Sequence, residues 1–320
     1  MPKRVIKSWP TCNKIIASLV IITVAVVGVY ALVTSRASSP AVGFEAESGT
    51  LNGGAAIKSD TNASGSSYVG FEAASTPVID SSSPAVIGIP GSTCANPVQS
   101  VTTPTFSPPA NSRIYIVVSA DSYPTGDANC LNETIQNSIA SVTSTAANSW
   151  SRVADTTQRN SGVGGFVDLW TTTIPTAQTN MQISVNFAAP MKAEPNQVSP
   201  SGLLKVIVVD NAGTTQTVVP SAVDQMSSKT STATATINNV PANSLAFMTV
   251  DYWNSYSTPP SVPSGQTVVG NVNNQGETDT WTVSDITTSG SSGPVTLTQN
   301  ITDSGHPTDN WHAVAWAVTP

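Results

Sequence analysis

From about residue 94 to residue 320, short runs of alternating apolar and polar residues are separated by clusters of Gly, Pro, Asn and Ser. Alternation with a period of two is typical of β-strands, because successive side chains of a strand point to opposite faces. No segment after residue 36 offers three turns of amphipathic helix, and the best candidate for a short helix is 131–141. The sequence therefore predicts an all-β fold, an antiparallel β-sandwich of the jelly-roll type, over 94–320.

Ten strands are expected in this region, and three of them should lie at the centre of a sheet. These three, RIYIVVS, LLKVIVV and SLAFMTV, are almost continuously apolar, which indicates burial on both faces. The last run contains two Trp residues and is expected inside a sheet, beside an early strand, as in jelly rolls. The expected strands cover 113–119, 150–154, 165–173, 181–187, 203–209, 231–237, 244–250, 280–284, 294–299 and 311–318.

The composition excludes several classes of protein. Only 10% of the residues are charged, against about 25% in typical soluble proteins, yet 39% are hydrophobic, which excludes a disordered chain. The formal net charge of −7 argues against binding to a nucleic-acid backbone, which needs a basic face, so no nucleic-acid partner is expected. Three cysteines are too few for a disulfide-dense scaffold.

Residues 15–33 form an uncharged, apolar run of 19 residues, close to the roughly 20 that cross a bilayer as a helix. Four basic residues precede the run within 1–14, and one, Arg36, follows it. The positive-inside rule then predicts a single-pass protein with a cytoplasmic stub, 1–14, and an extracellular part, 37–320. The alternative is a signal peptide cleaved near Ala37, which would release a secreted protein. We favour the anchor, because the run is longer than the about 7–15 apolar residues of such signals.

Two cysteines, Cys94 and Cys130, fall in the predicted extracellular part, where disulfides persist. A bond between them would close a loop of about 36 residues, and the chain-entropy description gives such a loop about 3–4 kcal/mol of stabilisation. The alternative is two free, buried thiols. We expect the disulfide.

A short stretch at 44–71 carries the motifs of a known family. It contains Glu45-Ala46-Glu47, a Gly53-Gly54 turn and an Ala-Ser-Gly-Ser-Ser-Tyr-Val element at 63–69. With these motifs the stretch resembles the opening of carbohydrate-binding modules of families 6 and 35. The resemblance implies that Glu45 and Glu47 help to bind a structural calcium ion, and their i, i+2 spacing puts both carboxylates on one face of a strand. The resemblance ends at residue 71, so we expect a short β module or hairpin over 37–72 without the sugar-contacting loops of that family.

Residues 73–93 are rich in Pro and Ser, with Pro77, Pro84 and Pro90 spread along the segment. Segments of this composition tend to be extended and semi-rigid. A linker that lifts 94–320 away from the membrane is therefore expected here.

The expected strands over 97–320 are accompanied by a turn at Asn148-Ser149-Trp150 and by a strand that contains Leu169-Trp170. In this order of elements the region resembles a domain that recurs in bacterial and phage surface proteins. The shared motifs are packing motifs, so the resemblance implies a fold but no substrate.

Residues suited to catalysis are scarce. The two histidines, His306 and His312, lie in a segment that could clasp a metal as a loop, but a polar loop followed by one strand histidine explains them better. Neither a G-x-S-x-G nor an H-E-x-x-H motif is present. No catalytic residue is assigned, and the chain is not expected to be an enzyme.

The best candidate for a binding site is an aromatic group that comprises Tyr252, Trp253, Asn254 and Tyr256. Its three rings leave an apolar strand and enter a Pro-containing loop. Aromatic faces stack on sugar rings and an amide can fix sugar hydroxyls, so the group suits a glycan or a protein partner. The alternative is that Tyr252 and Trp253 cap the hydrophobic core.

Together with the anchor, these features favour a membrane-anchored extracellular β-sandwich protein for surface display, adhesion or glycan binding. The alternatives are a purely structural component of a surface or phage-like assembly, and a polysaccharide-active enzyme. The expected partners are the membrane, through 15–33, and a cell-surface glycan or protein. No cofactor is expected beyond a structural calcium ion.

Overall fold

The structure is a computed structural model, in which two residues of the predicted membrane span, Thr23 and Val26, are described, both with helical backbone. The other described residues are 55–59, 61–62, 67–71, 75–90, 98–121, 138–146, 148–157, 165–191, 202–211, 218–230, 232–252, 260–274, 279–287, 291–300 and 309–320. Within these residues there is no helix with the length and apolar character needed to span a bilayer. The chain divides into two compact units, Met1–Phe71 and Glu72–Pro320.

The all-β prediction is confirmed, because 68% of the described residues lie in antiparallel sheets. The first unit contributes one hairpin, formed by β1 (Ala55–Ser59) and β2 (Ser67–Phe71). The second unit contributes the other strands. They are β3 (Val78–Ile79), β4 (Ile87–Gly88), β5 (Val98–Thr102), β6 (Ser112–Asp121), β7 (Ile139–Ser144), β8 (Ser151–Thr157), β9 (Gly165–Ile174), β10 (Ile183–Met191), β11 (Gly202–Asp210), β12 (Val218–Thr230), β13 (Thr232–Val240), β14 (Leu245–Tyr252), β15 (Gln266–Asn274), β16 (Asp279–Thr287), β17 (Gly293–Asn300) and β18 (Asp309–Val318).

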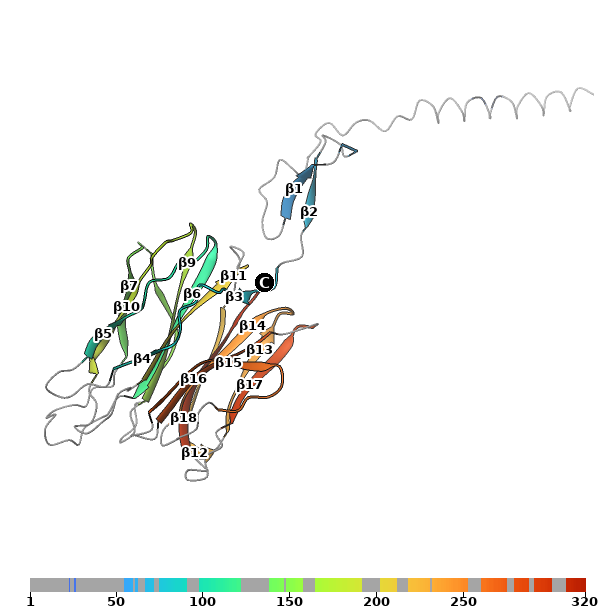
Figure 1. Ribbon diagram of the computed structural model, residues 1–320. Helices are drawn as coiled ribbons and strands as arrows, with labels where there is room; N and C mark the ends of the chain where they lie inside the picture. Colours follow the sequence, from blue (N-terminus) through green and yellow to red (C-terminus); the bar gives the residue numbers. More distant parts are fainter. Residues whose placement is uncertain are drawn as a thin grey trace, which may run out of the picture. The chain divides into compact units, whose positions relative to one another are not determined.

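The described strands of the second unit form four sheets, which follow one another across the unit (Figure 1). Sheet I has the order β5-β10-β7. Sheet II has the order β3-β11-β6-β9-β8, with β4 also paired to β11. Sheet III has the order β12-β18-β14-β16-β15, and sheet IV pairs β13 with β17.

Three apolar clusters join these sheets. In the first cluster, Ile183 of sheet I packs with Ile114 and Ile116 of β6 in sheet II. The second cluster lies between sheets II and III, and the third lies between sheets III and IV. In the second cluster, Tyr115 of β6 meets Trp316 of β18, with their ring centroids 6.0 Å apart.

The three strands with almost continuous apolar runs are central, as predicted. Along β6, Ile114 and Ile116 point into the first cluster, whereas Tyr115 and Val117 point into the second. The strand therefore needs apolar residues at consecutive positions, because both of its faces are covered. β11 and β14 are buried along almost their whole length for the same reason.

The last strand is packed inside a sheet, but its neighbours differ from those expected. Residues 311–318 of β18 are all buried, which confirms the packing. The strand lies between β12 and β14, with Trp316 opposite Pro220 on one side and Phe247 on the other. Both neighbours come late in the sequence, so the prediction of an early neighbouring strand is wrong. The best candidate for a short helix, 131–141, is a strand where it is described, because 139–141 belong to β7.

The segment expected to be a free linker is part of sheet II over 75–90, which we call the edge segment. Its two short strands, β3 and β4, pair with opposite ends of β11. Ile89 is 0% exposed in the first cluster, and its N–H donates to the carbonyl of Gly202 at 2.8 Å. The free side of β11 would otherwise leave backbone N–H and C=O groups without partners, and the edge segment satisfies them.

Between β3 and β4, hydrogen bonds with side chains replace the backbone hydrogen bonds of the strand pairing. The Val208 N–H donates to Ser83 Oγ at 2.9 Å, and Lys205 Nζ donates to the Pro84 carbonyl at 2.6 Å. Lys205 is 7% exposed, and its burial lowers the pKa of the ammonium group. Prolines are thus accommodated at the edge of the sheet, where a missing N–H costs little.

Candidate functional site

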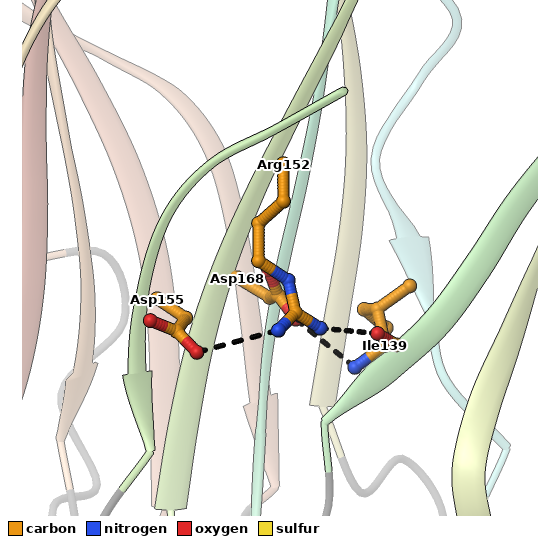
Figure 2. A network of polar contacts seen from close by, with 4 residues as sticks. All are labelled: Ile139, Arg152, Asp155 and Asp168. Atoms are coloured by element: carbon orange, nitrogen blue, oxygen red, sulfur yellow. Dashed lines mark hydrogen bonds and ion pairs between the residues drawn. The ribbon is translucent and has the colours of Figure 1, made fainter. Parts of the chain in front are cut away.

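A group of charged side chains lies where β8 and β9 meet the first residue of β7 (Figure 2). This group, which we call the clamp, consists of Arg152 and Asp155 on β8 and Asp168 on β9. In a regular strand, residues three apart point to opposite faces. A bulge between Arg152 and Ala154 shifts the register, so that Arg152 pairs with Trp170 and Asp155 pairs with Asp168. Trp170 and Asp168 are two residues apart on β9 and point to the same face. Both β8 side chains therefore lie on the same face as Asp168.

The clamp holds Ile139 of β7 by both of its backbone polar groups. The Ile139 N–H donates to Asp168 Oδ2 at 3.0 Å, and Arg152 Nη2 donates to the Ile139 carbonyl. Arg152 Nη2 also lies 3.0 Å from Asp168 Oδ2, and its Nη1 lies 3.4 Å from Asp155 Oδ2. The guanidinium carbon stands 5.2 Å from the centre of the Trp170 ring, which is a cation–π distance. Side chains of sheet II thus fix the first residue of β7, which is an edge strand of sheet I.

The electrostatics of the clamp are dominated by the burial of Asp168. Loss of hydration raises the pKa of this carboxyl to about 6. The hydrogen bond from Ile139 and the positive charge of Arg152 lower the pKa, while the negative charge of Asp155 raises it. The balance leaves Asp168 partly protonated near pH 6.

A buried carboxyl beside a second carboxylate is an arrangement that acid–base catalysis uses. In this chain, Asp168 is 0% exposed and points at a backbone group of β7. Only Arg152 and Asp155 reach solvent, with 34% and 39% of their side chains exposed. A substrate cannot contact the Asp168 carboxyl while β7 is in place, so the geometry suits a structural clamp.

The structure corrects one of the predicted ligand-binding residues. Tyr252 is 0% exposed in the third cluster, and its hydroxyl donates to the Gln299 carbonyl at 2.8 Å. Burial raises the pKa of this hydroxyl well above its usual value. The ring belongs to the core and cannot stack on a ligand. Trp253, Asn254 and Tyr256 lie outside the described residues, and their role stays a prediction.

Several strand ends meet where Tyr252 ends β14, a place that we call the Tyr252 end of sheet III. Tyr252 lies opposite Thr280 near the start of β16 and opposite Trp311 near the start of β18. Its hydrogen bond to Gln299 adds the end of β17. The segment that leaves β14, with Trp253, and the segment that enters β18, with His306, are therefore attached to the same end of the sheet.

The second histidine is a core residue. His312 of β18 lies opposite Asp251 of β14, and each is 1% exposed. Both alternate with residues of the third cluster, so they face sheet II. Asp251 is therefore a core residue as well. In the described part of the chain, no three His, Cys, Asp or Glu side chains gather closely enough to hold a metal ion.

Two other predicted sites fall outside the described residues. They are the calcium ligands Glu45 and Glu47 and the disulfide pair Cys94 and Cys130. Both sites stay predictions.

The clamp was not predicted from the sequence, although one signal pointed to it. Asp168 interrupts the apolar strand GFVDLW, and a charged residue inside a buried strand usually has a charged or hydrogen-bonding partner. The partner could not be found in the same way. Arg152 comes onto the right face only because of the bulge, which has no clear mark in the sequence.

Comparison with known proteins adds no assignment. Neither a family model, nor a curated protein, nor a solved structure matches the chain. The function is therefore inferred from the described geometry together with the sequence.

Proposed function

We propose that this chain is a membrane-anchored extracellular protein whose layered β-sandwich serves in surface attachment, with a glycan bound at the Tyr252 end of sheet III. The anchor is supported by the uncharged run 15–33 and by the basic residues that precede it. The sandwich is supported by the three apolar clusters that join sheets I to IV. A body built in this way can present a binding loop on a rigid support.

One observation carries the glycan part of the proposal, namely the burial of Tyr252 beside the ends of β16, β17 and β18. A buried ring with a bonded hydroxyl fixes the point at which the next segment begins. Side chains that start from a fixed point lose less conformational freedom when they bind a ligand. Trp253 and Tyr256 would then supply stacking rings, and Asn254 would supply hydrogen bonds to sugar hydroxyls.

The Trp253→Ala variant tests this proposal. We expect it to weaken binding to glycans retained by the wild type about tenfold, because a stacked ring and its buried area are lost. Its melting temperature should stay close to that of the wild type. The matched control is Tyr252→Phe, which removes the hydrogen bond to Gln299 and should cost about 1 kcal/mol of stability without changing glycan affinity.

The contrary result is also defined. If Trp253 belongs to the core, Trp253→Ala will cost about 3–5 kcal/mol of stability. Glycan affinity of the folded fraction would then be unchanged. Thermal unfolding and a glycan array on the same two variants separate these outcomes.

The burial of Tyr252 also favours a second candidate, a purely structural component of a surface assembly. With Tyr252 in the core, two of the three aromatic rings predicted to bind a ligand remain, Trp253 and Tyr256. In that case no glycan would be retained by the wild type. Cross-linking on intact cells would instead join the chain to neighbouring surface proteins.

A further inference from the structure

The chain contains three Asn-x-Ser/Thr sequences, the pattern that N-glycosylation of an asparagine requires. They begin at Asn62, Asn132 and Asn300. Patterns this short arise by chance in a chain rich in Ser and Thr, so their surroundings must decide which of them can be modified. Asn132 lies outside the described residues, and the structure distinguishes the other two.

Asn300 is held between two neighbouring segments. It is the last residue of β17, it is half-buried, and its side-chain oxygen accepts a hydrogen bond from Thr232 Oγ1 at 2.9 Å. Its N–H donates to the Ser261 carbonyl at 2.8 Å, and its own carbonyl accepts from the Ser261 N–H at 2.9 Å. A transferase must enclose the acceptor segment, so the end of β17 would first have to leave both neighbours. Asn300 is therefore a poor acceptor.

Asn62 has the opposite surroundings. The last backbone pair of the hairpin β1–β2 is Ser59–Ser67, and Asn62 falls between these two residues in the sequence. Thr61 and Asn62 lie in a turn, and both are exposed. An attached glycan is bulky and hydrophilic, so it needs an acceptor on the surface. Asn62 meets this condition, because it lies on the surface and outside the strand pairing.

The sequence around Asn62 carries a second signal. It reads Asp-Thr-Asn-Ala-Ser over 60–64, which puts the carboxylate of Asp60 two positions before the asparagine. The corresponding positions before the other two asparagines hold Cys130 and Thr298. A carboxylate there offers a charge-assisted hydrogen bond to a basic group of a transferase. Oligosaccharyl transferases of the bacterial type select this extended pattern, so Asp60 distinguishes Asn62 from the other two acceptors.

We propose that Asn62 is the acceptor of an N-linked oligosaccharide, added outside the cell membrane by an oligosaccharyl transferase of the bacterial type. The donor is an oligosaccharide linked to a polyprenyl diphosphate. The amide nitrogen of Asn62 attacks the anomeric carbon of the first sugar, the bond from this carbon to the diphosphate oxygen breaks, and the diphosphate leaves with the electron pair. The amide nitrogen loses one proton, and nothing is oxidised or reduced.

The modification rests on the proposed extracellular location of 37–320, because the transferase works on the outer side of the membrane. It does not depend on glycan binding at the Tyr252 end of sheet III. The two proposals can therefore be tested separately.

Mass spectrometry of the chain purified from the membranes of its own cells tests the modification. We expect the peptide with Asn62 to carry the mass of an oligosaccharide, and the peptides with Asn132 and Asn300 to be unmodified. Asn62→Gln should abolish the modification. Ser64→Ala should abolish it too, because it keeps the acceptor amide and removes the hydroxyl of the pattern. Asn300→Gln is the matched control and should leave the glycan at Asn62 unchanged.

Asp60→Asn tests the class of transferase, because it keeps the size of the side chain and removes its charge. The full chain is produced in cells that contain a bacterial-type transferase and its polyprenyl-diphosphate-linked oligosaccharide. The rate of glycosylation at Asn62 should fall about tenfold or more, as expected for the loss of one charged hydrogen bond. An unchanged rate would contradict recognition through Asp60.

An unmodified Asn62 in the native chain would refute the proposal. If external protease still releases peptides from 37–320 of that chain, the proposed display outside the cell stands without the modification. If external protease releases no such peptide, the extracellular location itself is wrong, and the modification is refuted with it.

Discussion

Ionisation of Asp168 opposes folding at neutral pH. The pKa of this carboxyl is about 6 in the folded chain, against an ordinary value of 3.8. Between these two values the folded state holds a proton that the unfolded state has released. The contribution of Asp168 to the free energy of unfolding therefore rises as the pH falls from about 7 to about 4. Asp285, whose pKa burial also raises to about 6, contributes in the same direction.

The Asp168→Asn variant removes this dependence while keeping an oxygen that can accept the Ile139 N–H. As the pH falls from 7 to 4, the free energy of unfolding of the wild type should rise by up to about 3 kcal/mol relative to that of the variant. Urea unfolding at several pH values measures the difference. Asp155→Asn serves as the comparison: loss of its negative charge should lower the pKa of Asp168, so the gain at low pH should become smaller but persist, because Asp168 stays buried. A difference between wild type and Asp168→Asn that is constant with pH would contradict the assignment.

At the scale of whole elements, the sequence predicts best the strands that are covered on both faces. The apolar runs in β6, β11 and β14 predict central strands correctly, because each face of these strands meets another sheet. β12 was missed, since it contains Pro220 and lacks a strong apolar alternation. The structure shows why such a sequence is accepted there, as β12 is an edge strand of sheet III, where Pro is tolerated.

The edge segment was misread for a related reason. Its Pro- and Ser-rich composition is that of a linker, and the local sequence does not reveal that β11 has a free side. Pairing with β11, the Ser83 and Lys205 hydrogen bonds and the burial of Ile89 are all long-range effects. Composition predicts local stiffness, but it does not predict what the segment packs against.

Ile89→Ala tests whether the edge segment belongs to the fold. Its side chain is fully buried in the first cluster, so the substitution should lower the free energy of unfolding by about 2–4 kcal/mol. The matched control is Val78→Ala in the same segment, where the side chain is 44% exposed and the cost should be below about 1 kcal/mol. Chemical denaturation of both variants gives the answer. Small and equal effects would mean that 75–90 is a free linker after all.

Gly202 at the start of β11 tests the close approach of β11 and β6. A Cβ atom at this position would lie 2.4 Å from Ala120 Cβ and 2.8 Å from the Ser119 carbonyl oxygen. Gly202→Ala should therefore cost about 2–3 kcal/mol, because backbone atoms would have to move. Gly270→Ala in β15 is the control, since its nearest neighbour would be Lys205 Cδ at 3.6 Å, an ordinary contact. Equal unfolding midpoints for the two variants would show that the strands can separate at little cost.

For the whole molecule, the sequence predicted part of the candidate binding site at the Tyr252 end of sheet III. It singled out the aromatic residues after β14 and the histidine segment before β18, and the strand register attaches both to the Tyr252 end of sheet III. It could not show that Tyr252 itself faces the core, because the rings of a short aromatic run look alike in sequence. Alternation along β14 decides the matter, since Tyr252 follows Met248 and Val250 on the face that meets sheet IV.

Display outside the cell on an uncleaved anchor is tested most directly by protease shaving of intact cells, combined with mass spectrometry of the membrane fraction. We predict that the chain stays with the membrane, that its residues 1–14 are retained, and that external protease releases peptides from 37–320. A mature chain that begins near residue 38 and is found in the medium would contradict the anchor and support a cleaved signal.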